Sequence, residues 1–165
     1  MNSSHHIVPI AQQHIAAFRE ALDAVAREQR YLAMPEAPPL TKVRRFVLDS
    51  LRAGAVHFVA LQDGRVIGWC DIRPKAQDTM RHCGVLGMGV VAGHRGQGLG
   101  RELLCMTLDA AFASGMTRIE LTVRADNAPA IELYRKLGFD AEGVCRRAMR
   151  VDGSYCDTVI MARLA

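Results

Sequence analysis

The chain has 165 residues, of which 50% are hydrophobic and 23% are charged, and its formal net charge is +4 at pH 7. This size favours one compact domain over residues 1–165, and the regular interruption of apolar segments by polar residues argues against disorder and against a membrane span. The basic residues are scattered and form no stripe with interleaved aromatic residues, which argues against a nucleic-acid partner.

The cysteines and the first residues bear on the cellular compartment. The chain has 5 cysteines, an odd number without C-x-x-C spacing, so we expect neither a disulfide framework nor a bound metal. Residues 1–6 lack the basic region and apolar core of a secretory signal. The sequence therefore predicts a cytoplasmic protein with reduced thiols.

The chain begins with two amphipathic helices separated by a proline-bearing loop. Apolar residues recur at three- and four-residue intervals over residues 12–28, which predicts the first helix. The loop over residues 34–40 follows, and Thr41 is the expected N-cap of a second helix that ends at Gly54. The apolar faces contain Ile15, Phe18, Leu22 and Val25 in the first helix and Val43, Phe46, Val47 and Leu51 in the second.

Two β-rich runs follow, over residues 56–61 and 65–72. They flank Asp63-Gly64, a dipeptide that accepts the positive φ angles of a tight turn, and this pattern predicts a hairpin. Pro74 is expected to end the second strand because proline has no amide proton to donate, and residues 75–84 are expected to form a polar loop.

The next elements alternate between strand and helix. Residues 85–91 predict a strand, which leads through a glycine-rich turn into a helix that ends at Gly115. Residues 117–124 alternate between apolar and polar side chains, as in a strand with one buried face. Asn127 is the expected N-cap of the last helix, which stops at Gly138.

A second hairpin is expected at the end of the chain. Residues 139–150 and 155–164 flank Asp152-Gly153, another dipeptide that suits a tight turn. The predicted order is helix, helix, three strands, helix, strand, helix and two strands. No internal repeat or linker interrupts it, which favours a single α/β domain.

The most specific segment is the glycine-rich turn between strand and helix, over residues 90–101. Its glycines allow the backbone to approach an anion closely, and the unpaired amides and dipole of the following helix supply donors and positive charge. Arg95 and Arg101 would add attraction. The segment therefore predicts a phosphate site, with an ordinary glycine-tolerant turn as the alternative.

Spacing separates this loop from two common nucleotide-binding motifs. A G-x-G-x-x-G dinucleotide fingerprint that starts at Gly96 requires a small residue where Arg101 stands. A P-loop requires Lys followed by Ser or Thr after Gly98, where Leu99-Gly100 stands. Neither motif fits this segment.

Arg95-Gly96-Gln97-Gly98-Leu99-Gly100 resembles the R/Q-x-x-G-x-G/A acetyl-coenzyme A signature of the GCN5-related N-acetyltransferases, the GNAT family. Residues 123–139 resemble the next strand and helix of that family, with Asn127, Tyr134 and a closing Leu-Gly-Phe. The order of elements matches as well. The resemblance implies an α/β (α+β) fold, a single domain whose mixed, mostly antiparallel and twisted central sheet is flanked by about four helices.

The resemblance also implies how acetyl-coenzyme A (acetyl-CoA) is bound. The loop amides would hold the pyrophosphate, strand residues would pair with the pantetheine arm, Asn127 would bond that arm, and Tyr134 would lie beside the sulfur. The implied cofactor-binding residues are Gly89, Val90, Val91, Arg95, Gly96, Gln97, Gly98, Leu99, Gly100, Arg101, Asn127 and Tyr134. The interior glycines Gly87 and Gly89 are typical of a bulge or a close ligand approach, with simple tolerance of glycine as the alternative.

Direct acetyl transfer requires a neutral amine, a donor to the developing oxyanion and a proton for the departing thiolate. A strand amide near Val90 is a candidate oxyanion donor. Tyr134, with a reference pKa near 10, is the candidate general acid, and a core aromatic is the alternative reading of this residue.

The general base is less determined by the sequence. Glu120, Asp71 and Glu36 could each accept a proton through water, and each could instead be an ion-paired or solvated carboxylate. His57 and His82 have suitable reference pKa values but read more naturally as structural residues. No cysteine has His and Asp or Asn partners that can be placed nearby, so direct attack by the amine is expected.

These observations predict an acetyl-CoA-dependent N-acetyltransferase that acts on a primary amine. We expect the amine of a small metabolite, because Glu36, Asp71 and Glu120 could recognise a cation. The alternatives are a protein or peptide N-terminus or lysine as acceptor, a non-catalytic acyl-CoA sensor, and a basic nucleic-acid binder. The family commonly pairs, so a homodimer is also expected.

Overall fold

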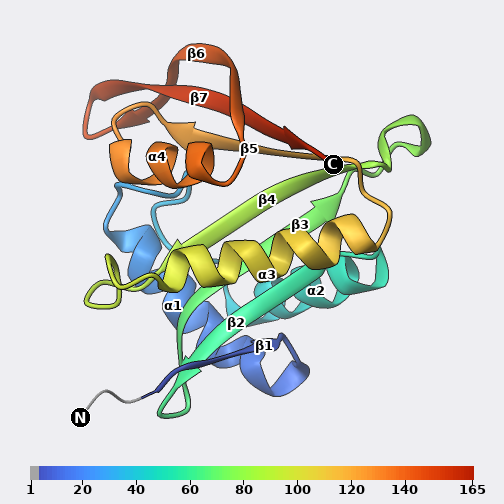
Figure 1. Ribbon diagram of the computed structural model, residues 1–165. Helices are drawn as coiled ribbons and strands as arrows, with labels where there is room; N and C mark the ends of the chain where they lie inside the picture. Colours follow the sequence, from blue (N-terminus) through green and yellow to red (C-terminus); the bar gives the residue numbers. More distant parts are fainter. Residues whose placement is uncertain (1–3) are drawn as a thin grey trace.

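The computed structural model describes residues 4–165, which form a seven-stranded sheet with helices on both faces (Figure 1). Two 3-10 turns, Gln12–His14 and Asp78–Met80, accompany the longer elements. In chain order the strands and helices are β1 (His6–Pro9), α1 (Ile15–Arg27), α2 (Leu40–Arg52), β2 (Val56–Gln62), β3 (Arg65–Pro74), β4 (Cys83–Val90), α3 (Leu99–Ala113), β5 (Arg118–Arg124), α4 (Ala128–Lys136), β6 (Asp140–Val151) and β7 (Ser154–Leu164).

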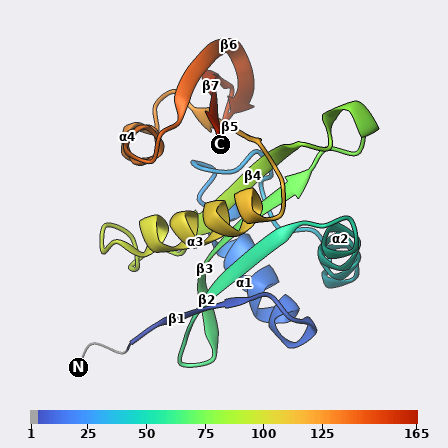
Figure 2. The ribbon, with the colours of Figure 1, turned by 45° about the vertical axis from the view of Figure 1, so that its right-hand side comes forward.

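The sheet consists of two halves that meet between β4 and β5. The strand order is β1-β2-β3-β4-β5-β7-β6, and every neighbouring pair is antiparallel except β4 and β5. These two strands pair only between residues 83–85 and 118–120. Beyond that point β4 continues to Val90 and β5 to Arg124 without mutual pairing, and Figure 2 shows the two halves diverging.

Each face of the sheet is covered by one pair of helices. The apolar stripes of α1 and α2 pack with β1, β2 and β3 around Trp69, whereas α3 and α4 cover the opposite face. The larger core, on the side of α3, includes the fully buried Leu103, Leu104 and Leu108. The mixed, mostly antiparallel sheet with four helices confirms the predicted architecture.

Local signals in the sequence located most element boundaries. The helices α2, α3 and α4 are each followed by a glycine with positive φ, at Gly54 (+91°), Gly115 (+96°) and Gly138 (+83°). The dipeptides Asp63-Gly64 and Asp152-Gly153 have positive φ at both residues, as the primed hairpin turns require. The predicted helix ends and hairpins are confirmed.

Two predicted boundaries and one omission need correction. Helix α2 begins at Leu40 with Pro39 as its N-cap, so Thr41 lies inside the first turn and does not cap it. Strand β3 ends at Pro74, as predicted, but β4 begins at Cys83, so residues 83–84 of the expected loop belong to a strand. Strand β1 was not predicted, since four residues that end in proline at a sheet edge carry little periodicity.

Candidate active site

The divergence of β4 from β5 leaves main-chain groups of β4 without a strand partner. The Val91 amide donates to the Ile67 carbonyl at 2.9 Å, so Val91, Gly89 and Gly87 direct their main-chain groups toward β3. By the alternation of an antiparallel ladder, the amides of Met88 and Val90 point the other way, toward β5. Of the implied pantetheine partners, only Val90 therefore presents its amide to the opening.

The two interior glycines of β4 make room for side chains of β3. A Cβ at Gly89 would lie 2.3 Å from the Trp69 ring, and one at Gly87 would lie 3.1 Å from the Asp71 Oδ1 atom. The β3–β4 register runs without a shift, so β4 has no bulge. The expectation of a bulged β4 is wrong, because divergence from β5 frees the amides instead.

The glycine-rich turn is open on the side that an anion would approach. Gly93, Gly96 and Gly98 have φ values of +87°, +73° and +89°, and no described atom lies within 4 Å of a Cβ built at Gly93 or Gly96. Gly98 is the N-cap of α3, and the first helical hydrogen bond runs from the Glu102 amide to the Gly98 carbonyl. The amides before Glu102 lack helical partners and fit a pyrophosphate.

The side chain of Arg95 is bound within the protein. Its Nε donates to the Val90 carbonyl at 2.8 Å, and its terminal nitrogens donate to both Glu28 carboxylate oxygens at 2.8 and 2.6 Å. The guanidinium also lies over the Tyr31 ring, 4.4 Å from its centroid. The expectation that this charge attracts phosphate is not supported, because Glu28 neutralises it. Arg95 instead ties the glycine-rich turn to the end of α1.

The other predicted loop residues lie at the turn itself. The side-chain Nε2 of Gln97 donates to the Gly93 carbonyl at 3.0 Å, which is a hydrogen bond within the turn. Gly100 lies where an added Cβ would make ordinary contacts with Met88, at 3.6 Å, and with residues of β4 and α4. Arg101 is exposed, and no ion pair to it is found within residues 4–165.

The segment after α1 is held from both halves of the sheet. Arg95 binds Glu28 from the β4 side, and the Arg124 NH1 group donates to the Gln29 carbonyl at 3.2 Å from the β5 side. Arg124 also pairs with Asp126 at 2.6 Å. The connection between α1 and α2 therefore spans the gap between the diverging strands (Figure 2).

Asn127 performs the predicted local role. Its side chain accepts a hydrogen bond from the Ala130 amide at 3.4 Å, so it caps α4. It also lines a small cavity of about 60 Å³ together with Arg30, Tyr31 and Pro129. This cavity lies where the α1–α2 connection meets the start of α4.

Tyr134 combines deep burial with an unengaged hydroxyl group. The residue is 7% exposed, and its ring packs against Phe139 with centroids 5.7 Å apart. No hydrogen bond to the hydroxyl is found within residues 4–165, and the hydroxyl oxygen is not completely shielded from solvent. Burial raises the pKa of Tyr134, so the phenol is protonated at neutral pH. The structure thus leaves a protonated hydroxyl available.

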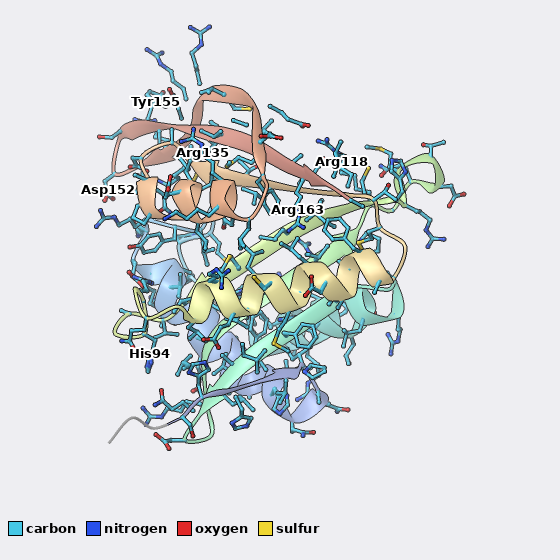
Figure 3. The ribbon with its side chains drawn as sticks, in the orientation of Figure 1. His94, Arg118, Arg135, Asp152, Tyr155 and Arg163 are labelled. Carbon is cyan, nitrogen blue, oxygen red and sulfur yellow. The ribbon has the colours of Figure 1, made fainter. Side chains whose placement is uncertain are left out.

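The position of Tyr134 depends on a contact from β7. The Arg163 NH1 group donates to the Leu137 carbonyl at 3.0 Å, and its guanidinium lies 5.2 Å from the Phe112 ring centroid. Figure 3 shows Arg163 between α3 and α4. This arginine holds the end of α4 against α3.

Asp71 is a buried carboxylate with one engaged oxygen. Its Oδ2 accepts a hydrogen bond from the Arg73 Nε at 3.0 Å, whereas Oδ1 faces Gly87 and has no hydrogen-bond partner in the described part of the chain. Burial raises the pKa of Asp71 to about 6, although Arg73 opposes this rise. Asp71 is therefore a candidate base whose pKa lies near neutrality.

Asp71 and Tyr134 lie on opposite faces of the sheet. Tyr134 belongs to the core on the α3 side, which includes Cys70, and Asp71 follows Cys70 along β3 and must point to the other face. The opening between β4 and β5 lies in the plane of the sheet, between these two faces. A group held in this opening would have an acid on one side and a base on the other.

The other candidate bases are engaged in ion pairs or in the core. Glu120 contacts Lys75 at 2.5 Å and Arg118 at 3.2 Å, and Glu36 contacts Arg27 at 3.0 Å. Burial lowers the pKa of His57 to about 3, and no hydrogen-bond partner of its Nε2 is found among residues 4–165. Burial also raises the pKa of the Cys70 thiol. The ion-paired and structural interpretations hold for these groups.

Several residues at this site carried no signal in the sequence. Glu28 and Arg95 are 67 residues apart, and Arg124 and Gln29 are 95 residues apart. Arg73 was also missed, because its role depends on the orientation of Asp71 on the same strand. Arg95 was predicted as part of the glycine-rich turn, but its partner Glu28 and the contact between Arg124 and Gln29 were not.

The described residues show two further absences. No group of three or more His, Cys, Asp or Glu side chains that could hold a metal ion is found within residues 4–165. No helix in that range is both long enough and apolar enough to cross a membrane.

Comparison with known proteins identifies the family. Residues 19–139 match the acetyltransferase (GNAT) family. The L-amino acid N-acetyltransferase AaaT of Escherichia coli K12 is 33% identical over 114 residues, covering 68% of this chain and 70% of that protein. The N-alpha-acetyltransferase RimI of Mycobacterium tuberculosis is 37% identical over 104 residues, covering 62% of this chain and 64% of that protein.

Solved structures share the fold. The putative acetyltransferase YncA of Salmonella typhimurium, solved with its cofactor acetyl-CoA, has a TM-score of 0.90 at 21% identity, covering 99% of this chain and 94% of that chain. A GNAT acetyltransferase from Streptococcus pneumoniae has a TM-score of 0.91 at 24% identity, covering 98% and 100%. With this fold, an open glycine-rich turn and the family match over most of its length, the chain belongs to the GNAT family of acetyl-CoA-dependent N-acetyltransferases.

Proposed function

We propose that this enzyme acetylates the primary amine of a small metabolite by direct attack on the acetyl-CoA thioester, with Asp71 as general base and Tyr134 as general acid. The observation that carries this proposal is the placement of the two side chains. Within residues 4–165, no hydrogen bond is found to the Tyr134 hydroxyl or to Asp71 Oδ1, which faces Gly87 beyond the last β4–β5 pair, and the two side chains lie on opposite faces of the sheet.

The main chain would bind and polarise the cosubstrate. Acetyl-CoA supplies the activated acetyl group when it is bound. The amides of residues 96–101 would hold its pyrophosphate, and the amides of Met88 and Val90 would bond the pantetheine arm and the thioester carbonyl. Because these donors are fixed by β4 and α3, stabilising the developing oxyanion requires no reorganisation.

The side chains would move the protons. The amine would attack in its neutral form, and Asp71 Oδ1 would accept the proton that its nitrogen loses as the C–N bond forms, directly or through water, on the face covered by α1 and α2. Tyr134 would donate its proton to the thiolate on the face covered by α3 and α4. No acyl-enzyme is required, since the buried Cys70 thiol has a raised pKa and would be a poor nucleophile.

The relatives support small acceptors without deciding among them. AaaT is an L-amino acid N-acetyltransferase, and RimI is an N-alpha-acetyltransferase. An acidic site for a cationic amine receives less support, because Glu36 and Glu120 are both ion-paired. A peptide N-terminus is the second candidate, from the similarity to RimI. A homodimer and a cytoplasmic location stay predictions.

An amine screen with detection of free coenzyme A tests this proposal. We expect turnover with at least one class of small primary amine. In the Tyr134→Phe variant we expect kcat to fall by a factor of about 100 or more, with the acetyl-CoA dissociation constant within about twofold of wild type. Tight acetyl-CoA binding without turnover on any amine or peptide would favour a sensor. Equal kcat in the variant would remove the acid role of Tyr134.

A further inference from the structure

A cavity lies between α2 and the end of β3, and it is lined by Arg73, the residue that pairs with Asp71. Its volume is about 480 Å³, which is in the range of sites for small molecules. Lys42, Arg45 and Arg73 line it with Phe46 and Asp49. Arg73 therefore links the cavity to Asp71, the proposed base.

The charge of this cavity is positive. Asp49 pairs with Arg52 at 2.9 Å and Arg73 pairs with Asp71 at 3.0 Å, which leaves Lys42 and Arg45 in excess. Lys42 and Arg45 are exposed, and no ion pair to either is found within residues 4–165. Like charges gathered without counter-charges favour the binding of an anion.

Arg73 connects the cavity to the proposed reaction centre. Its Nε binds Asp71 Oδ2 at 3.0 Å, and its guanidinium lies 5.0 Å from the centroid of the exposed Phe46 ring. No partner of its terminal nitrogens is found in the described part of the chain. A planar guanidinium with two free donors suits a carboxylate. An anion bound to the terminal nitrogens of Arg73 would lie on the other side of the guanidinium group from Asp71.

We propose that the cavity binds a carboxylate group of the acceptor, so that the substrate is an amino acid with a free carboxyl group. Arg73 and Arg45 bind the carboxylate, Lys42 adds attraction, and the face of Phe46 contacts an apolar part of the substrate. This inference rests on the proposed function. It reverses the expectation of an acidic acceptor site, because the uncompensated charge beside Asp71 is positive.

Matched acceptors test the carboxylate. The wild-type enzyme is assayed by coenzyme A release with sets of amines that share one side chain and differ only in carrying a carboxylate, a carboxamide, a hydrogen or a phosphonate. We expect kcat/KM for the carboxylate to exceed that for the carboxamide and for the decarboxylated amine at least tenfold. A preference for the phosphonate, or equal rates for all four, would overturn the assignment.

Variants on the exposed face of α2 test the location. In a Lys42→Ala, Arg45→Ala double variant we expect KM for the carboxylate acceptor to rise at least tenfold, with the acetyl-CoA dissociation constant and the KM of the carboxamide unchanged. Arg44→Ala is the control, since Arg44 lies on the same helix but does not line the cavity. Unchanged KM in the double variant would refute the site. Absence of all amine acetylation despite acetyl-CoA binding would refute the proposed function itself.

Discussion

Gly98 has a φ of +89° at the N-cap of α3, a torsion that side chains rarely adopt. Its exposed face leads into the turn where the pyrophosphate is expected. Gly115 has a φ of +96° at the other end of the same helix, also with open space around it. Both glycines have a positive φ, and only Gly98 lies at the proposed site.

Gly98→Val is therefore expected to raise the acetyl-CoA dissociation constant at least tenfold, measured by calorimetry. The added β-branched side chain strains the turn and occupies the side that the phosphate approaches. Gly115→Val is the control, because it imposes similar strain and is expected to leave acetyl-CoA binding unchanged. Equal effects of both substitutions would mean that strain alone is responsible.

The raised pKa of Asp71, about 6, predicts a pH dependence of the reaction. A general base acts in its ionised form, so kcat/KM is expected to fall as the pH decreases through about 6. Asp71→Asn is expected to lower kcat/KM by a factor of about 100 and to abolish this inflection. The measurement is the pH profile of both proteins with the same acceptor. An inflection that persists in the variant would assign it to another group.

At the scale of elements, the Arg95–Glu28 ion pair joins the cofactor turn to the connection that follows α1. Both side chains are about two-thirds buried, with 32% and 29% exposed. Removing either partner frees the turn and the α1–α2 connection together. We therefore propose Arg95 as a positioning residue for both substrates.

Glu28→Gln is expected to raise KM for acetyl-CoA and for the amine acceptor about threefold to tenfold each. Arg95→Gln is expected to raise both KM values at least as much, because it also loses the hydrogen bond to the Val90 carbonyl and the contact with the Tyr31 ring, and the double variant is expected to match Arg95→Gln. Glu132→Gln, in an exposed ion pair with Lys136, is the control. Weaker acetyl-CoA binding in Arg95→Gln with an unchanged KM for the acceptor would show direct phosphate binding by Arg95.

For the molecule as a whole, two buried groups have opposite effects on the free energy of unfolding as the pH falls. His57 and Asp71 lie opposite each other on β2 and β3. The pKa of His57 is about 3 in the folded protein against 6.5 when free, so stability is lost as the pH falls from 6.5. The pKa of Asp71 is about 6 against 3.8, so stability is gained as the pH falls from about 6.

Removing one of these two groups is therefore expected to change the pH dependence of the free energy of unfolding. Relative to wild type, the free energy of unfolding of His57→Gln is expected to increase by about 1.4 kcal/mol per pH unit as the pH falls from 6 to 4. Urea unfolding at several pH values measures this difference. His82→Gln, at an exposed position, is the control. A pH-independent difference would show that His57 takes up no extra proton on unfolding.

Local patterns in the sequence determined the helices, most strands, the hairpin turns, the Asn127 cap and the glycine-rich turn. Each of these depends on backbone torsions or on burial periodicity, which neighbouring residues specify. The tertiary structure alone decided that β4 leaves β5 after Val85, that Arg95 binds Glu28, and that Asp71, not Glu120, keeps an unengaged oxygen. These outcomes depend on strand register and on partners distant in the chain, so no local pattern can encode them.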